Sequence, residues 1–314
     1  MLFWGFNFIS LKILYPVMEP AAIMFWRYFL MGGILVGICL LTGNSLKIPR
    51  EHRNRILFAG FNSMGLYMIF FMEGVKLSSA GESAIILVTN PIMIAIWMMV
   101  LKLEPKSWAK VFGGLIAVVG VALVVMGRPG VVASSKETSD RLLGDFLMLL
   151  GAASWSWAIV ISKPISAHIK PLPLFTMSML GGLPVILLYG FAPAMRVHWA
   201  EFTPWQWGNF LQIALGSGVI GMVFYYKGIQ QLPASVATMH QFLVPILTTI
   251  YAAIVLHERL AWTQAVGLAV LIFGVMVAMG MVRRNTGIQS LSKVDMANEE
   301  SNHATPLGES VSGP

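Results

Sequence analysis

Long apolar stretches dominate the chain and recur at short intervals between small clusters of polar residues. A helix needs about 20 mostly apolar residues to cross a bilayer. By that criterion the sequence predicts ten membrane-spanning helices, at 1–15, 20–41, 55–73, 79–101, 108–127, 143–163, 172–191, 205–226, 233–256 and 262–282. The first stretch is short for a span, so we expect that residues are missing before position 1.

Composition leads to the same class of protein. Hydrophobic residues make up 57% of the chain and charged residues 11%, whereas soluble domains have roughly 45–50% and about 25%. This balance excludes a soluble enzyme, a coiled coil and a disordered chain. The net charge of +7 does not indicate a nucleic-acid partner, because the basic residues lie between apolar runs. The sequence therefore predicts an all-α integral membrane protein surrounded by a lipid bilayer.

The distribution of positive charge predicts the orientation in the membrane. Ten spans place both termini on one side. Thirteen lysines and arginines then fall on that side and seven on the other. The positive-inside rule therefore predicts cytoplasmic termini for a multi-pass protein of the cytoplasmic (inner or plasma) membrane. Residues 283–314 are polar and lack periodicity, which predicts a disordered cytoplasmic tail.

An internal repeat organises the chain. When it is shifted by 154 residues, 63–125 align with 217–279 without a gap, and 13 of the 63 positions are identical, among them Ser63/Ser217, Pro91/Pro245, Glu104/Glu258, Gly113/Gly267 and Gly120/Gly274. A shorter match at an offset of 151 pairs Trp4 with Trp155 and Lys12 with Lys163. We expect the glycines to permit close helix packing.

The repeat predicts two units of opposite orientation. We expect five-helix repeats at 1–128 and 143–282, joined by a loop at 129–142. Five is an odd number, so the second unit enters the bilayer in the opposite sense. Inverted repeats are the usual architecture of secondary transporters, which bind substrate near the midplane between the halves.

Several short segments resemble a known family. The start WGFNFISLK (4–12), the arginine of FWRYF (25–29), and the pair LKLEPKSW (101–108) and VLHERLAW (255–262) look like the EamA family of the drug/metabolite transporter superfamily. The resemblance covers about residues 1–282, as two tandem units. It implies a carrier that exports or exchanges amino acids or other small metabolites. It also implies a cavity lined by the first, third, fourth, sixth, eighth and ninth helices.

Paired prolines point to the midplane site. Pro91 and Pro245 lie near the middle of their spans, and a proline leaves the carbonyl four residues back without a donor. Such a carbonyl must face protein, water or ligand at bilayer depth; the alternative is a simple packing kink. The cavity candidates are these prolines and the polar or aromatic residues Asn7, Asn90, Trp155, Asn209, Gln212, His240 and Gln241.

His240 is the one histidine inside a predicted span. Its unperturbed pKa of about 6.5 would let it change charge across a proton gradient. We therefore consider it a candidate for proton coupling. The alternative is a neutral histidine that is hydrogen-bonded to a neighbouring carbonyl.

Charged residues near the span ends are candidates for gates, namely Lys12, Arg27, Glu73, Glu82 and Lys163. An arginine within the membrane is usually paired, so we expect Arg27 to contact Glu73 or Glu82. The spacing from Ser79 to Glu82 also predicts a capping box, which would give Glu82 a structural role. Lys12 and Lys163 are equivalent in the repeat, and snorkelling at the interface is the alternative to gating.

Signals for other chemistry are missing from the sequence. We find no zinc-protease, P-loop or nucleophile-elbow motif and no metal-ligand spacing. The single cysteine, Cys39, excludes a disulfide framework. We therefore expect no enzyme activity, no cofactor, no metal and no ATP-driven transport. The predicted function is secondary transport of a small metabolite by alternating access, with amino acids first by resemblance. The alternatives are efflux of drugs or toxic compounds, and a membrane-embedded enzyme or sensor.

Overall fold

The computed structural model describes residues 2–47, 49–102, 108–126, 135–166, 168–231, 241, 243–257 and 261–278. These residues form helices and turns and contain no strand, which confirms the all-helical prediction for this part of the chain. The first unit contains α1 (Leu2–Leu14), α2 (Pro20–Leu41), α3 (Arg53–Gly60), η1 (Phe61–Leu66), α4 (Tyr67–Leu77), α5 (Ala80–Leu87), α6 (Asn90–Val100) and α7 (Trp108–Met126). The second contains α8 (Ser135–Ile165), α9 (Pro171–Ala194), η2 (Trp199–Glu201), α10 (Pro204–Leu211), η3 (Gln212–Ile220), α11 (Gly221–Gln231), α13 (Leu243–Tyr251), η5 (Ala252–Leu256) and α14 (Trp262–Ala278).

Six helical stretches of the described chain are long and apolar enough to cross a membrane. They are Pro20–Leu41, Arg53–Leu77, Ala80–Val100, Glu137–Ile165, Pro171–Ala194 and Pro204–Gly228. Large apolar side chains on their outer surfaces are exposed, as at Leu40, Leu188 and Phe224. Exposed apolar surface of this kind favours contact with lipid rather than water. The total of ten spans stays a prediction of the sequence.

Local chemistry accounts for two helix boundaries. Pro91 lies at the start of α6, and α5 ends four residues before it at Leu87, so the proline breaks the fourth span as expected. Ser79 Oγ accepts a hydrogen bond from the Glu82 amide at 3.1 Å, and the Glu82 carboxylate accepts one from the Ser79 amide at 3.4 Å. The predicted capping box is thereby confirmed.

One predicted boundary is wrong. We expected a connecting loop at 129–142, but α8 begins at Ser135, so residues 135–142 are helical. Because these residues are polar, a hydropathy criterion does not detect them as part of a helix. Glu137 in the first turn favours helix formation through the dipole.

Two π-helical segments occur at equivalent places in the repeat. The segments η1 and η3 interrupt the third and eighth predicted spans, and each contains one member of the repeat-equivalent pair Ser63 and Ser217. Each serine Oγ lies 2.9 Å from the carbonyl oxygen four residues earlier. Such π-helical turns often accompany functional sites.

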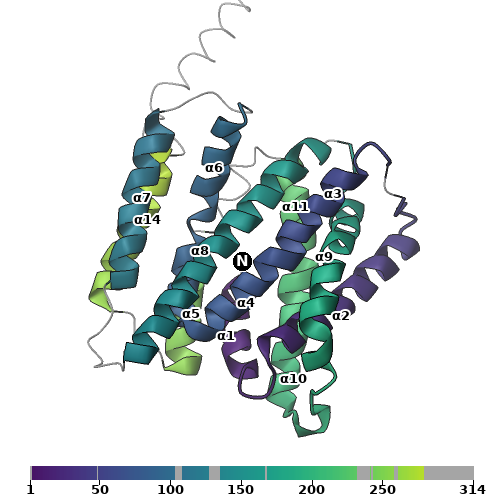
Figure 1. Cartoon of the computed structure of the whole chain (residues 1–314), viewed down its shortest axis with the longest axis horizontal. Helices are drawn as coiled ribbons and strands as arrows, with labels where there is room; N and C mark the ends of the chain where they lie inside the picture. The colour runs from purple at the N-terminus through teal and green to yellow at the C-terminus, as the bar shows by residue number, and fades with distance from the viewer. Residues whose placement is uncertain are drawn as a thin grey trace, which may run out of the picture.

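Glycine permits the close packing of α7 and α14, which lie side by side (Figure 1). A Cβ atom at Gly120 would lie 2.4 Å from the Leu271 amide nitrogen, and one at Gly274 would lie 2.5 Å from that of Ala117. The expected packing role is confirmed for these two glycines.

The first helix of each unit packs against the other unit. Helix α1 contacts α10, η3 and α13, which belong to the second unit, while α8 contacts α3, α4, α5 and α6 of the first. The two units are therefore interlocked rather than simply adjacent. The space between α1, α8 and their partners contains the site.

Candidate functional site

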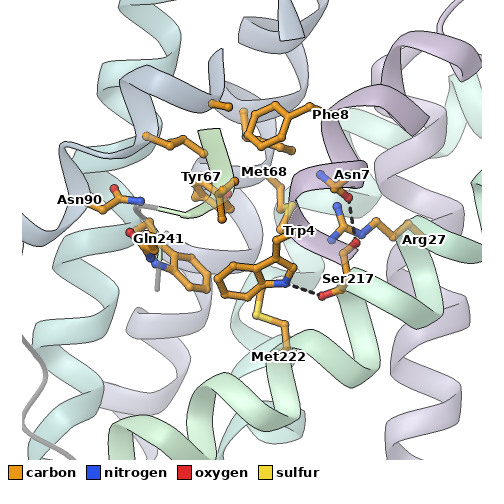
Figure 2. A pocket seen from close by; sticks show the side chains of 15 residues that line it. Trp4, Asn7, Phe8, Arg27, Tyr67, Met68, Asn90, Ser217, Met222 and Gln241 are labelled. Atoms are coloured by element: carbon orange, nitrogen blue, oxygen red, sulfur yellow. Dashed lines mark hydrogen bonds between the residues drawn. The ribbon is translucent and has the colours of Figure 1, made fainter. Parts of the chain in front are cut away.

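A cavity lies between the two units (Figure 2), and two of its lining residues lie near the middle of their helices. Asn90 lies halfway along Ala80–Val100 and Trp155 lies close to the centre of Glu137–Ile165. The cavity measures about 600 Å³, counted as all the space between its lining atoms and including its open mouth. Its lining comprises Trp4, Asn7, Phe8, Arg27, Tyr67, Met68, Phe71, Ala84, Leu87, Asn90, Trp155, Ser217, Met222, Gln241 and Val244.

Repeat-equivalent residues from both units contribute to this central cavity. Four pairs line it, namely Trp4/Trp155, Met68/Met222, Leu87/Gln241 and Asn90/Val244. The first two pairs are identical, whereas each of the other two joins an apolar residue with an amide. The frame of the cavity is thus symmetric and its polarity is not. Such an arrangement is suited to a small molecule with distinct ends.

Aromatic side chains form much of the wall. The ring centroid of Trp155 lies 5.0 Å from that of Tyr67 and 5.8 Å from that of Tyr225, and Trp4 lies 5.3 Å from Tyr225. The Trp4 indole Nε1 donates to the Ser217 carbonyl at 3.0 Å, which fixes its ring. These contacts make a rigid apolar surface with a few polar groups.

Two amides lie on one side of the cavity (Figure 2). Ser156 Oγ lies 3.2 Å from the Asn90 carbonyl and 3.4 Å from Asn90 Oδ1, either of which can accept its proton. Gln241 Oε1 is buried and has no hydrogen-bond partner. A buried acceptor without a donor is costly, so this oxygen is positioned to accept a hydrogen bond from a bound molecule.

Arg27 approaches the cavity from α2 on the other side (Figure 2). The side chain is 5% exposed, and its Nε and Nη1 atoms are buried without hydrogen-bond partners. The expected pairing with Glu73 or Glu82 is wrong. Glu73 accepts a hydrogen bond from the Tyr189 hydroxyl, and Glu82 accepts from Ser78 and Gln264. Pairing depends on how each helix is rotated, which the sequence does not specify.

The structure places other candidates outside the cavity lining. Gln212 forms two hydrogen bonds to α1. Its Nε2 donates to the Phe3 carbonyl at 2.7 Å, and its Oε1 accepts from Ser10 Oγ at 3.1 Å. Asn209 is buried, and its Nδ2 donates to the Trp205 carbonyl at 2.8 Å. Pro91 and Pro245 are buried next to lining residues without lining the cavity themselves. His240 lies outside the described residues.

Lys12 belongs to a polar cluster near one end of the helices. Its Nζ donates to the carbonyls of Lys76 (3.3 Å) and Ser78. The Ser78 hydroxyl lies 2.8 Å from Asp145 Oδ1, and Gln264 Nε2 donates to Glu82 Oε1 at 2.8 Å. We call this set the Lys12 cluster: Lys12, Ser78, Glu82, Asp145 and Gln264. Lys163 lies half-buried near the opposite end of α8 and outside the cavity.

Sequence reasoning missed several lining residues, above all Tyr67, Met222 and Ser217. The first two look like ordinary core residues in an apolar span. Ser217 carried a usable signal, because it is identical to Ser63 in the repeat and lies within an apolar run. In the part of the chain that the structure describes, no group of three His, Cys, Asp or Glu side chains could hold a metal ion.

Comparison with known proteins assigns this architecture to a family. The model of the EamA-like transporter family matches residues 1–126 and 142–280. The uncharacterized transporter YyaM of Bacillus subtilis is 24% identical over 90% of this chain and 92% of its own. An uncharacterized transporter of Archaeoglobus fulgidus is 23% identical over 88% and 93%. A solved crystal structure has the same fold, with a TM-score of 0.65 and 18% identity over 91% of this chain and 96% of its own.

Proposed function

Because the chain belongs to the EamA-like transporter family, we propose that it is a secondary transporter that moves a small metabolite by alternating access. Relatives named as transporters support a transport role for this multi-pass membrane protein. Amino acids are the first candidate cargo, by the family resemblance. The membrane is the cytoplasmic one and both termini are cytoplasmic, by the charge distribution.

The central cavity carries this proposal. It lies at mid-depth between two repeat-related units, where secondary transporters bind their cargo. Small-molecule sites are typically apolar clefts with a few placed polar groups, and the lining here matches that description. Asn90 and Gln241 are the hydrogen-bonding residues of one side, and Trp155 contributes the aromatic wall.

The Lys12 cluster supports a gate at one end of this pathway. Lys12 lies on the same face of α1 as Phe8, four residues earlier, which lines the cavity. It connects α1 to the C-terminal end of α4, where exposed carbonyls favour a positive charge. Opening of this end requires that these hydrogen bonds break. Lys163, Lys12's equivalent in the repeat, is the corresponding candidate at the opposite end.

Flux through proteoliposomes tests the proposal. Purified protein is reconstituted, loaded with unlabelled amino acids and small metabolites, and assayed for uptake of a labelled panel, with and without a pH gradient. We expect saturable uptake of at least one compound. Asn90→Ala and Gln241→Ala should each raise its KM by about two- to tenfold, the effect of losing one hydrogen bond.

Exposed residues of the same types serve as controls for these variants. Asn54→Ala and Gln231→Ala remove an exposed asparagine and an exposed glutamine outside the cavity lining, so they should leave KM unchanged. Equal effects of the cavity and control variants would contradict the proposed site. Folded protein without flux for any compound of a wide panel would contradict transport itself.

Proton coupling by His240 is the mechanistic part of the proposal. A histidine titrates near neutral pH and is suited to this role. His240→Gln should abolish the stimulation of uptake by a pH gradient while exchange of internal for external cargo continues. Stimulation that survives this substitution would show that another group, or no proton, drives transport.

A further inference from the structure

We propose that Arg27 binds a carboxylate of the cargo, and that the cargo is a small monoanionic carboxylate with an aromatic or apolar body. This inference rests on the proposed transport function and names the chemical class that the cavity accepts. Three features carry it: the state of Arg27, the donors beside it and the composition of the remaining lining.

Arg27 is a buried cation without a described counter-charge. Its Nε and Nη1 atoms are buried and unpaired, and the side chain lines the central cavity. Among the described lining residues it is the only one with a formal charge. An unpaired charge in a low-dielectric interior is strongly unfavourable. A bound anion would remove that penalty, since a guanidinium presents a fork of donors that matches a carboxylate.

A second donor lies beside the guanidinium. Figure 2 shows Asn7 and Ser217 next to Arg27, joined by a hydrogen bond in which Ser217 Oγ donates to Asn7 Oδ1 at 2.8 Å. This bond occupies the amide oxygen of Asn7 and leaves its NH₂ group as a donor. Arg27 and Asn7 together therefore offer donors, from two helices, to the same anionic group.

The rest of the cavity defines the body of the cargo. Trp4, Phe8, Tyr67, Phe71 and Trp155 supply aromatic surface, and the lining includes no described carboxylate. The unpaired Gln241 Oε1 lies on the opposite side of the cavity from Arg27 (Figure 2), where it can accept a hydrogen bond from the far end of the cargo. The predicted cargo thus has a carboxylate at one end and an apolar body that leads toward Gln241.

Electrostatics favours a monoanion over a zwitterion or a cation, so this inference ranks simple carboxylates above the zwitterionic amino acids that the family resemblance places first. A monoanion neutralises Arg27, whereas a zwitterion leaves the cavity with a net positive charge. An aromatic wall can also bind an ammonium group through cation–π contacts, but a cation would be repelled by Arg27 in the same cavity. The arginine therefore argues against cationic compounds as the preferred cargo.

A matched ligand series tests the proposal on purified wild-type protein in lipid nanodiscs. The four probes share one phenyl body: 3-phenylpropionate (anion), L-phenylalanine (zwitterion), 3-phenylpropionamide (neutral) and phenethylamine (cation). Binding is measured as stabilisation against thermal unfolding, which a ligand of the folded state produces without any transport. We expect 3-phenylpropionate to bind at least about tenfold more tightly than the amide or the amine, the effect of a charged hydrogen bond. Equal or tighter binding of the amide, the amine or phenylalanine would overturn the proposal.

Variants test whether the preference for the anionic ligand depends on Arg27. Arg27→Gln should remove the preference of the anion over the amide, and Arg27→Lys should retain part of it because the charge is kept. Arg196→Gln, at an exposed arginine, is the control and should preserve the preference. An anion preference that is unchanged in folded Arg27→Gln or Arg27→Lys protein would overturn the assignment. If Arg27→Gln does not fold, the Arg27→Lys variant and the wild-type ligand series still test whether Arg27 binds the carboxylate.

Flux measurements distinguish a failure of this inference from a failure of the proposed transport function. Saturable transport of some compound that carboxylates do not inhibit would overturn the carboxylate class and leave the transporter in place. Anion binding without flux of any compound would support the subsite and contradict transport.

Discussion

Replacing Gly181 with leucine is expected to remove nearly all folded protein from the membrane. A Cβ atom at this position would lie 1.9 Å from the Leu57 carbonyl oxygen and 2.8 Å from the Phe61 amide nitrogen. Both neighbours are backbone atoms and cannot rotate away. The contact is reciprocal, because a Cβ atom at Gly60 would lie 1.6 Å from the Ser178 carbonyl oxygen. Helices α3 and α9 would have to separate.

The expected loss in the free energy of unfolding is large relative to the total stability of the protein. Separation of α9 from α3 and η1 loosens the packing around the third predicted span, which continues into α4 and the cavity lining. Overpacking of this kind can cost about 5 kcal/mol, which is comparable with the total stability of many domains. The readout is the yield of monodisperse protein after extraction, together with its unfolding temperature.

Gly33 provides the matched control. An added Cβ atom there meets nothing within 4 Å, and the residue is exposed on α2. Gly33→Leu should therefore give wild-type yield, and Gly181→Ala should fall between the two leucine variants. A normal yield and unfolding temperature for Gly181→Leu would contradict the close approach of α3 and α9.

Features that depend on a few neighbouring residues could be predicted from the sequence. The capping box at Ser79 and the break at Pro91 follow from local hydrogen bonding and from the missing amide hydrogen of proline. The packing role of Gly120 and Gly274 followed from small residues at matching repeat positions. The start of α8 was missed because its first turns are polar, and hydropathy detects only the apolar part of a helix.

The cavity could be predicted only in part, because its lining depends on tertiary packing as well as on local sequence. Polar residues beside the repeat-equivalent prolines led to Asn90 and Gln241, which the structure places in the lining. Asn209 and Gln212 are equally polar, but their side chains contact Trp205 and α1 instead. Which face of a helix meets which neighbour depends on tertiary packing. That no carboxylate of the described residues contacts Arg27 is therefore a finding that only the structure could provide.

Substitution of Lys12 by alanine is expected to open one end of the transporter. Lys12 Nζ bonds two carbonyls at the C-terminal end of α4, and the buried hydrogen bonds of Ser78, Glu82, Asp145 and Gln264 surround this contact. Hydrogen bonds from a charged group are worth about 1.5–3 kcal/mol. Their loss should shift the population toward the state open at this end by about tenfold or more. Transport should slow, because closure at this end becomes unfavourable.

A cysteine in place of Phe8 reports the opening. Phe8 is buried and lines the cavity four residues from Lys12, while the native Cys39 is also buried. A membrane-impermeant thiol reagent is applied to vesicles of both orientations, and the rate of modification should rise about tenfold in Phe8→Cys/Lys12→Ala protein from one side only. That side identifies where Lys12 lies, which the charge distribution predicts to be the outside. Lys76→Ala is the control, since it removes an exposed lysine at the same end and leaves the carbonyl contacts of Lys12 intact. Equal modification rates in the Lys12 and Lys76 variants would mean that the Lys12 cluster only stabilises the fold, because a structural bond would not change access to the cavity.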